Sequence, residues 1–356
     1  MLSRRRKWGQ MADQDTSRKR IDWIDAAKGI GILLVVAGHV MLEGGMAFPG
    51  SDVARDFIYS FHMPLFFMIS GVLLGLSLAN READSAYVGQ KSRSLAKRLL
   101  VPFFIWSVIY FLLGHGNLQD TSALVKSFAS MVTFRGQAPI WFLGALFWAE
   151  VFALLIVFIS KKRVKWVLVS FAVVVLLACA AWWFYNPDAA APMYLKYLMI
   201  AVFRGLVCLL FVLAGYLASP ILLKEGKASI SLVAFLASAG ESVAVFALFD
   251  NGCNLHTFRI VSMPVFIVSG LSGSLAVLYL CKALCALVRS RILVVIGQET
   301  LGVMCIHYRP FPFMAYASDI CAYLSVTGFA AFLLSFAFVF GCAFSGTKLL
   351  KRCPIV

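Results

Sequence analysis

The sequence predicts an all-α fold, a polytopic membrane bundle of about ten transmembrane helices with both termini in the cytoplasm. Two observations lead to this prediction. The 356 residues are 61% hydrophobic and only 14% charged, whereas a soluble domain is nearer half apolar and a quarter charged. In addition, long apolar runs alternate with short basic segments, as in a multi-pass protein. The net charge of +15 is divided among these short segments, so we expect membrane lipid as a partner and no nucleic acid.

Each expected span is an apolar run bounded by charged or turn-forming residues. The ten spans cover residues 22–41, 57–79, 99–114, 139–159, 164–184, 196–218, 228–249, 259–281, 291–307 and 322–345. The basic N-terminus is not followed by a short apolar core with a small-residue cleavage site, so the first span is expected to be uncleaved. Between the third and fourth spans, residues 115–137 are expected to contain an amphipathic segment on the outer surface.

The distribution of Lys and Arg predicts the orientation. Basic residues gather in every second connecting segment, around residues 81–98, 161–165, 224–227, 282–291 and 348–352. By the positive-inside rule these segments are cytoplasmic, which makes the protein a multi-pass component of the inner (cytoplasmic) membrane. The expected organisation is a basic cytoplasmic tail (1–20), one transmembrane domain (21–347) and a short cytoplasmic tail (348–356).

The first span carries a stripe of ionisable residues. His39 follows Lys28 by 11 residues and therefore returns to the same helix face, while Asp25 lies about 40° away and about 21 Å along the axis. Ionisable groups at membrane depth are costly and usually face a bundle interior, which makes these three residues functional candidates. The alternative is a helix end whose charges reach the interface, plus one core histidine with satisfied hydrogen bonds.

Further polar residues are expected in the outer half of the bundle. They are Arg55 and His62 at the start of the second span, Trp141 on the fourth, Arg204 on the sixth, Glu241 on the seventh and His307 at the end of the ninth. Arg204 and Glu241 lie at similar expected depth, so they would either form a structural ion pair or take part in a site. Trp141 would either contribute to a site or anchor its helix at the interface.

On the inner side, Arg93, Lys97 and Arg98 precede the third span. Arg93 and Lys97 are four residues apart and share a helix face. Such a cluster either anchors the helix by its positive charge or binds phosphate groups. No phosphate-binding glycine loop or nucleophile-elbow motif is present. Cys281 and Cys285 lack a second pair of ligands, so no metal site is expected.

Several motifs resemble the acyltransferase 3 family of membrane acyltransferases, particularly its fucose 4-O-acetylase-like branch. The opening RIDWIDAAKGIGILLVVAGH (20–39) is similar to the first motif of that family. Later blocks agree in order and spacing: FHMPLFFMISG (61–71), KRLLVPFFIW (97–106), PIWFLGALF (139–147) and IGQETLGVMCIHY (296–308). The ten-span topology also matches the family.

The resemblance implies transfer of an acyl group, expected to be acetyl from acetyl-CoA, to a sugar hydroxyl of a cell-surface glycan or of its lipid-linked precursor. The family's histidine falls on His39 and its acidic and basic positions on Asp25 and Lys28; lysine replaces the more frequent arginine. The second block adds His62 and the third adds Arg98. The phosphates of a cytoplasmic acyl-CoA would suit Lys28, Arg93, Lys97 and Arg98.

On this interpretation His39, Asp25, His62 and Glu241 are the catalytic candidates. His39 would act as a general base or would carry the acyl group transiently, and Glu43 or Glu241 would orient it. The candidates for substrate binding are Arg55, Trp141, Arg204 and His307. A rival hypothesis is a transporter or exporter of a polysaccharide or its precursor, but the chain lacks repeated halves and an evident pair of broken helices. A membrane scaffold would leave the first-span stripe unexplained. The sequence is compatible with a homo-oligomer.

Overall fold

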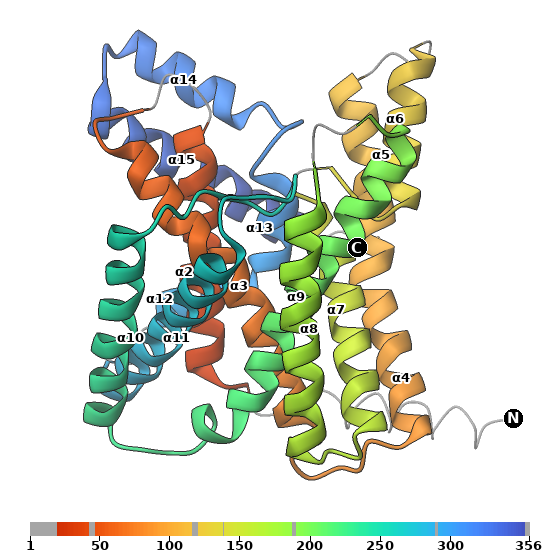
Figure 1. Cartoon of the computed structure of the whole chain (residues 1–356). Helices are drawn as coiled ribbons and strands as arrows, with labels where there is room; N and C mark the ends of the chain where they lie inside the picture. The colour runs from red at the N-terminus through yellow and green to blue at the C-terminus, as the bar shows by residue number, and fades with distance from the viewer. Residues whose placement is uncertain are drawn as a thin grey trace, which may run out of the picture.

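The computed structural model describes residues 20–42, 47–115, 120–137, 139–186, 190–288 and 291–352, and these are almost entirely helical (Figure 1). A short antiparallel hairpin pairs strand β1 (Cys253–Asn254) with β2 (Arg259–Ile260) in the connection between two helices. The expectation of an all-α, polytopic membrane bundle is confirmed.

Within the described ranges, nine helices are long and apolar enough to cross a membrane. Eight of them are α2 (Asp22–Leu42), α3 (Ser51–Leu78), α7 (Trp141–Ile159), α8 (Val164–Phe184), α9 (Met193–Leu222), α10 (Ala228–Leu248), α11 (Met263–Leu287) and α15 (Gly328–Leu350). The remaining one runs without interruption through α4 (Ser85–Leu95), the π-helical turn η1 (Ala96–Leu100) and α5 (Val101–His115). Each overlaps an expected span, although several extend beyond it; the largest difference is in the helix through α4, η1 and α5, which begins at residue 85 and not at 99.

The expected span over residues 291–307 is instead two short helices, α12 (Arg291–Gln298) and α13 (Thr300–Ile306). They meet at Glu299, whose carboxylate lies 2.7 Å from the ammonium of Lys351 at the end of α15. Gly302 of α13 packs against Thr347 of α15. The helix is thus interrupted at an acidic residue inside an apolar run. The charge of this residue is compensated by a cation from another helix.

The backbones of α2 and α12 approach each other at two glycines. A methyl group added to Gly297 would collide with the backbone oxygen of Asp25, and one added to Gly29 would collide with the backbone oxygen of Leu293. Small residues permit such close crossings. Because the hydrophobic effect does not drive helices together in lipid, this close packing contributes to their association. This crossing fixes the position of α2 relative to α12 and to α13, which follows it.

Two shorter helices lie at the upper end of the bundle in Figure 1. α6 (Thr121–Val132) falls in the region where an amphipathic outer segment was expected, and α14 (Phe313–Tyr323) was not expected. α10 packs mainly against α11, so most of its surface is exposed in the monomer. The core is formed chiefly by α2, α3, α7, α9 and α11.

We expect Gly297→Ala to destabilise the bundle, because the added methyl group has no space at the α2–α12 crossing. Overpacking of this kind typically costs about 1–3 kcal/mol. The matched control is Gly341→Ala on α15, where an added Cβ meets nothing within 4 Å. Thermal unfolding in detergent should show a lower midpoint for Gly297→Ala alone; equal midpoints would show that the crossing is not constraining.

The orientation from the Lys and Arg distribution stays a prediction, and reporter fusions can test it. A reporter after Arg352, or one inserted at residues 161–165, should give a cytoplasmic signal, and one near Asn251 should give an outer signal. An outer signal from the fusion after Arg352 would contradict the predicted topology.

Candidate functional site

Two histidines from distant parts of the chain meet in the bundle interior. Nε2 of His307, at the end of α13, lies 2.9 Å from Nδ1 of His39, near the outer end of α2 as we orient it. The side chain of His307 is fully buried, whereas His39 is partly exposed. The ring of Tyr308 lies 4.5 Å from that of His39. The first span thus keeps its histidine in the interior and pairs it with a second imidazole.

The hydrogen bonds around His307 determine which nitrogen carries the proton. Its Nδ1 lies 2.9 Å from the carbonyl oxygen of Val303 and 3.1 Å from that of Met304. Carbonyl oxygens only accept hydrogen bonds, so Nδ1 carries the hydrogen, and Nε2 of the neutral ring is an acceptor. His39 must therefore donate from its Nδ1, which leaves a lone pair on its Nε2. This is the form in which an imidazole can accept a proton from a substrate.

His39 lines a cavity of about 130 Å³. Aromatic and imidazole side chains from several elements surround it: Tyr59, His62, Trp141, His256 and Tyr308. Nδ1 of His62 donates to the carbonyl oxygen of Ile58 at 2.8 Å, so the Nε2 of this second imidazole is also an acceptor. The sequence-based candidates His39, His62 and Trp141 therefore share one cavity.

Arg204 on α9 is fully buried and contacts the connecting segments beside this cavity. Its guanidinium donates to the carbonyl oxygens of Phe134, Arg135 and His256 at 2.9–3.2 Å and lies 4.6 Å from the centre of the Trp141 ring. These contacts hold two connecting segments against α7 and α9. Two of its three donor nitrogens, Nη1 and Nη2, are directed to backbone carbonyls, so Arg204 positions these segments. Its expected role in substrate binding stays a prediction.

The ion pair between Arg204 and Glu241, one of the two alternatives that the sequence left open, is not formed. Glu241 is exposed on α10, which packs mainly against α11, and carbonyl dipoles compensate Arg204 in its place. Glu241 also does not orient His39, whose hydrogen-bond partner is His307. The other residue considered for that role, Glu43, lies outside the described residues.

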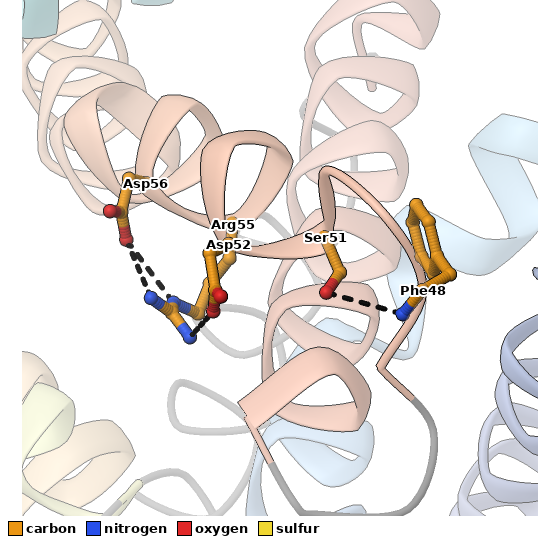
Figure 2. Close-up of polar contacts among 5 residues, drawn as sticks. All are labelled: Phe48, Ser51, Asp52, Arg55 and Asp56. Atoms are coloured by element: carbon orange, nitrogen blue, oxygen red, sulfur yellow. Dashed lines mark hydrogen bonds and ion pairs between the residues drawn. The ribbon is translucent and has the colours of Figure 1, made fainter. Parts of the chain in front are cut away.

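Arg55 lines an open cavity of about 510 Å³ together with Asp56 and the β1–β2 connection. This cavity adjoins that of His39, because Tyr59, Cys253 and Asn254 line both. Figure 2 shows its guanidinium between two carboxylates of its own helix, Asp52 at 2.7 Å and Asp56 at 3.1 Å. A substrate contact from Arg55 would have to compete with these two ion pairs.

At the expected inner end of α2, Lys28 forms an ion pair with Asp25 at 2.9 Å. The Asp25 side chain is the more buried partner, and its backbone also forms part of the Gly297 crossing. The lower part of the expected stripe is therefore a paired carboxylate and ammonium, separate from the histidine pair near the other end of the helix.

The three cations before the third span are all exposed, but they are not equivalent. Arg98 lies 3.4 Å from both carboxylate oxygens of Glu150 on α7, and Glu150 is buried and also accepts a hydrogen bond from Ser70 at 2.8 Å. Arg93 and Lys97 have no ion pair among the described residues. These two are therefore the cations available to an anionic ligand.

The sequence interpretation missed three features of the site. His307 was a candidate for substrate binding, although it is the hydrogen-bond partner of His39. His256 and Tyr308, which line the same cavity, were not singled out. Tyr308 belongs to the IGQETLGVMCIHY block and could have been found with His307, whereas His256 lies in an unremarkable connection. In the described ranges, no three His, Cys, Asp or Glu residues are arranged to hold a metal ion.

Comparisons with known proteins identify the family of the chain. A family model described as an acyltransferase domain matches residues 21–348. The nodulation protein NolL of Mesorhizobium japonicum (strain LMG 29417 / CECT 9101 / MAFF 303099) is 31% identical over 159 residues, which are 43% of this chain and 40% of NolL. The aligned part therefore spans less than half of that relative. Because the family match covers nearly the whole described bundle, the chain belongs to the acyltransferase 3 family of membrane acyltransferases.

Proposed function

We propose that this protein is an O-acyltransferase of the inner membrane that moves an acetyl group from cytoplasmic acetyl-CoA to a hydroxyl of a cell-surface glycan or its lipid-linked precursor. One observation carries the proposal: in a chain of this family, His39 lines a cavity and forms a hydrogen bond with His307 that leaves Nε2 of His39 as an acceptor. A sugar acceptor is in keeping with the motifs that resemble the fucose 4-O-acetylase-like branch.

In this mechanism His39 acts as the general base. Its Nε2 removes the proton of the acceptor hydroxyl, and the hydroxyl oxygen forms a bond to the acyl carbon. The carbon–sulfur bond of the thioester breaks, and the imidazolium returns its proton to the departing thiolate. The positive charge formed on His39 in between is stabilised by its Nδ1–H bond to Nε2 of the neutral His307.

The acyl donor would bind at the cytoplasmic side through its phosphates. Arg93 and Lys97 are exposed and have no carboxylate partner among the described residues, which favours them over Arg98 with its buried Glu150. Lys28 is also close to this side of the membrane in our orientation, but its ammonium already pairs with Asp25. We therefore assign the main phosphate contacts to Arg93 and Lys97.

We expect His39→Ala to reduce acyl transfer by at least 10²–10⁴-fold, the usual contribution of general base catalysis, without changing donor binding. His307→Phe should lower kcat about 10–100-fold, because the bond that stabilises the charged His39 is lost. His307→Gln should recover much of this loss, since its amide oxygen can accept from Nδ1 of His39. Transfer is measured with purified protein, labelled acetyl-CoA and candidate lipid-linked glycans.

The pH profile separates base catalysis from a merely structural role. The rate for the wild type should rise from acidic to neutral pH as His39 loses its proton, and His307→Gln should displace this rising limb. Near-normal transfer by a folded His39→Ala variant would contradict the proposed mechanism. A labelled acyl-protein that forms without acceptor and requires His39 would identify this residue as an acyl carrier instead of a base.

Arg93→Ala and Lys97→Ala should each raise KM for acetyl-CoA about tenfold with little change in kcat, because a phosphate contact is remote from the reacting carbonyl. Lys224→Ala is the matched control, since Lys224 is an exposed cation in another segment expected on the cytoplasmic side. Kinetics at varied donor concentration provide the measurement. An unchanged KM in both variants would place the donor phosphates elsewhere.

A further inference from the structure

A further polar cavity, of about 450 Å³, lies beside the cavity of His39, between α6 and the N-terminal part of α9. α6 packs against α9 at the upper end of the bundle (Figure 1). We call this cavity the outer pocket; its lining includes Lys126, Ser130, Arg135, Gln137, Tyr197 and His256. His256 lines both cavities, so a molecule held in the outer pocket is adjacent to the cavity of His39.

The outer pocket has an excess of positive charge. Arg135 lies 4.4 Å from the centre of the Tyr197 ring, and its Nε is buried without a hydrogen-bond partner in the described part of the chain. It has no carboxylate partner among those residues either, and Lys126 is likewise unpaired. Asp120, the acidic residue in the lining, accepts the backbone N–H of Ala123 at 3.0 Å and thus caps α6.

Burial and positive charge also change the pKa values of groups that line the outer pocket. Burial, together with Arg204 and Arg135, lowers the pKa of His256 to about 3, so this imidazole is neutral at physiological pH. Burial also lowers the pKa of Arg135 itself. Desolvated cations are normally compensated by a carboxylate or by a bound anion. The hydroxyl of Ser130 is a further buried group in the lining without a hydrogen-bond partner among the described residues.

We propose that the outer pocket binds an acidic group of the acceptor, a phosphate or a carboxylate, held by Arg135 and Lys126. This inference rests on the proposed transfer to a glycan and makes it more specific: the acceptor is negatively charged, and its acidic group is fixed next to His256 while its hydroxyl reaches His39. The planar guanidinium of Arg135 can donate two parallel hydrogen bonds to either kind of oxyanion.

Calorimetric titration of the purified full chain tests this proposal with three probes: inorganic pyrophosphate, glucuronate and neutral methyl glucoside. At least one anion should bind and the neutral sugar should not. Arg135→Gln should weaken that binding about tenfold or more, the effect of losing one charge-assisted contact. Tighter binding of pyrophosphate points to a lipid-linked sugar phosphate, and tighter binding of glucuronate to an acidic sugar.

The matched control is Lys196→Gln, because Lys196 precedes Tyr197 in the chain but does not line the pocket. This variant should bind the anion like the wild type. Lys126→Gln provides a second pocket variant at an exposed position in case Arg135→Gln does not fold. Absence of anion binding, or equal binding by wild type and the pocket variants, would overturn the proposal.

The same titration separates this inference from the proposed function. His39→Ala should bind the anion normally although it does not transfer the acyl group. Anion binding without any acyl transfer by the wild type would refute the proposed function alone. Acyl transfer to neutral and acidic acceptors alike, without anion binding, would refute the outer pocket alone.

Discussion

The close contact between the backbones of α2 and α12 constrains the rest of the site. Gly29 and Gly297 allow the two helices to touch without intervening side chains. α13 begins two residues after α12 ends, so its position relative to α2 depends on this crossing. Only then do Nδ1 of His39 and Nε2 of His307, 268 positions apart in the chain, come within 2.9 Å. The hydrogen bond of the proposed mechanism is thus positioned by the packing of small residues, a common feature of helix association in lipid.

The buried charged side chains of the bundle are compensated in different ways. The kind of compensation indicates whether a residue has a structural role or is available to a ligand. Asp25 with Lys28, and Glu299 with Lys351, form ion pairs that stabilise the helix ends. Arg204 donates to carbonyl oxygens and so organises connecting segments without a counter-charge. Arg135 stacks on Tyr197 but has neither kind of compensation among the described residues. A cation that the protein leaves uncompensated is the better candidate for a ligand site.

Composition and the spacing of apolar runs were sufficient to predict the fold class and the position of nine helices, because each span must satisfy its own backbone hydrogen bonds in lipid. The break at Glu299 was missed because its compensating cation, Lys351, is supplied by another helix. The site could likewise be predicted only where a single helix carries the signal. His39 could be found from the stripe on a single helix, whereas its pairing with His307, and the separation of Arg204 from Glu241, depend on which helices touch. The motifs predicted the family correctly, and its fucose-related branch stays a prediction.

The contacts between α13 and α15 give the C-terminal helix a second function. Lys351 binds the carboxylate at the start of α13, and Thr347 packs against Gly302 within it, so the last described turn of the chain supports the helix that ends in His307. The last turn of α15 therefore helps to hold His307 in place. In practical terms, shortened versions of the protein should retain α15 through Lys351.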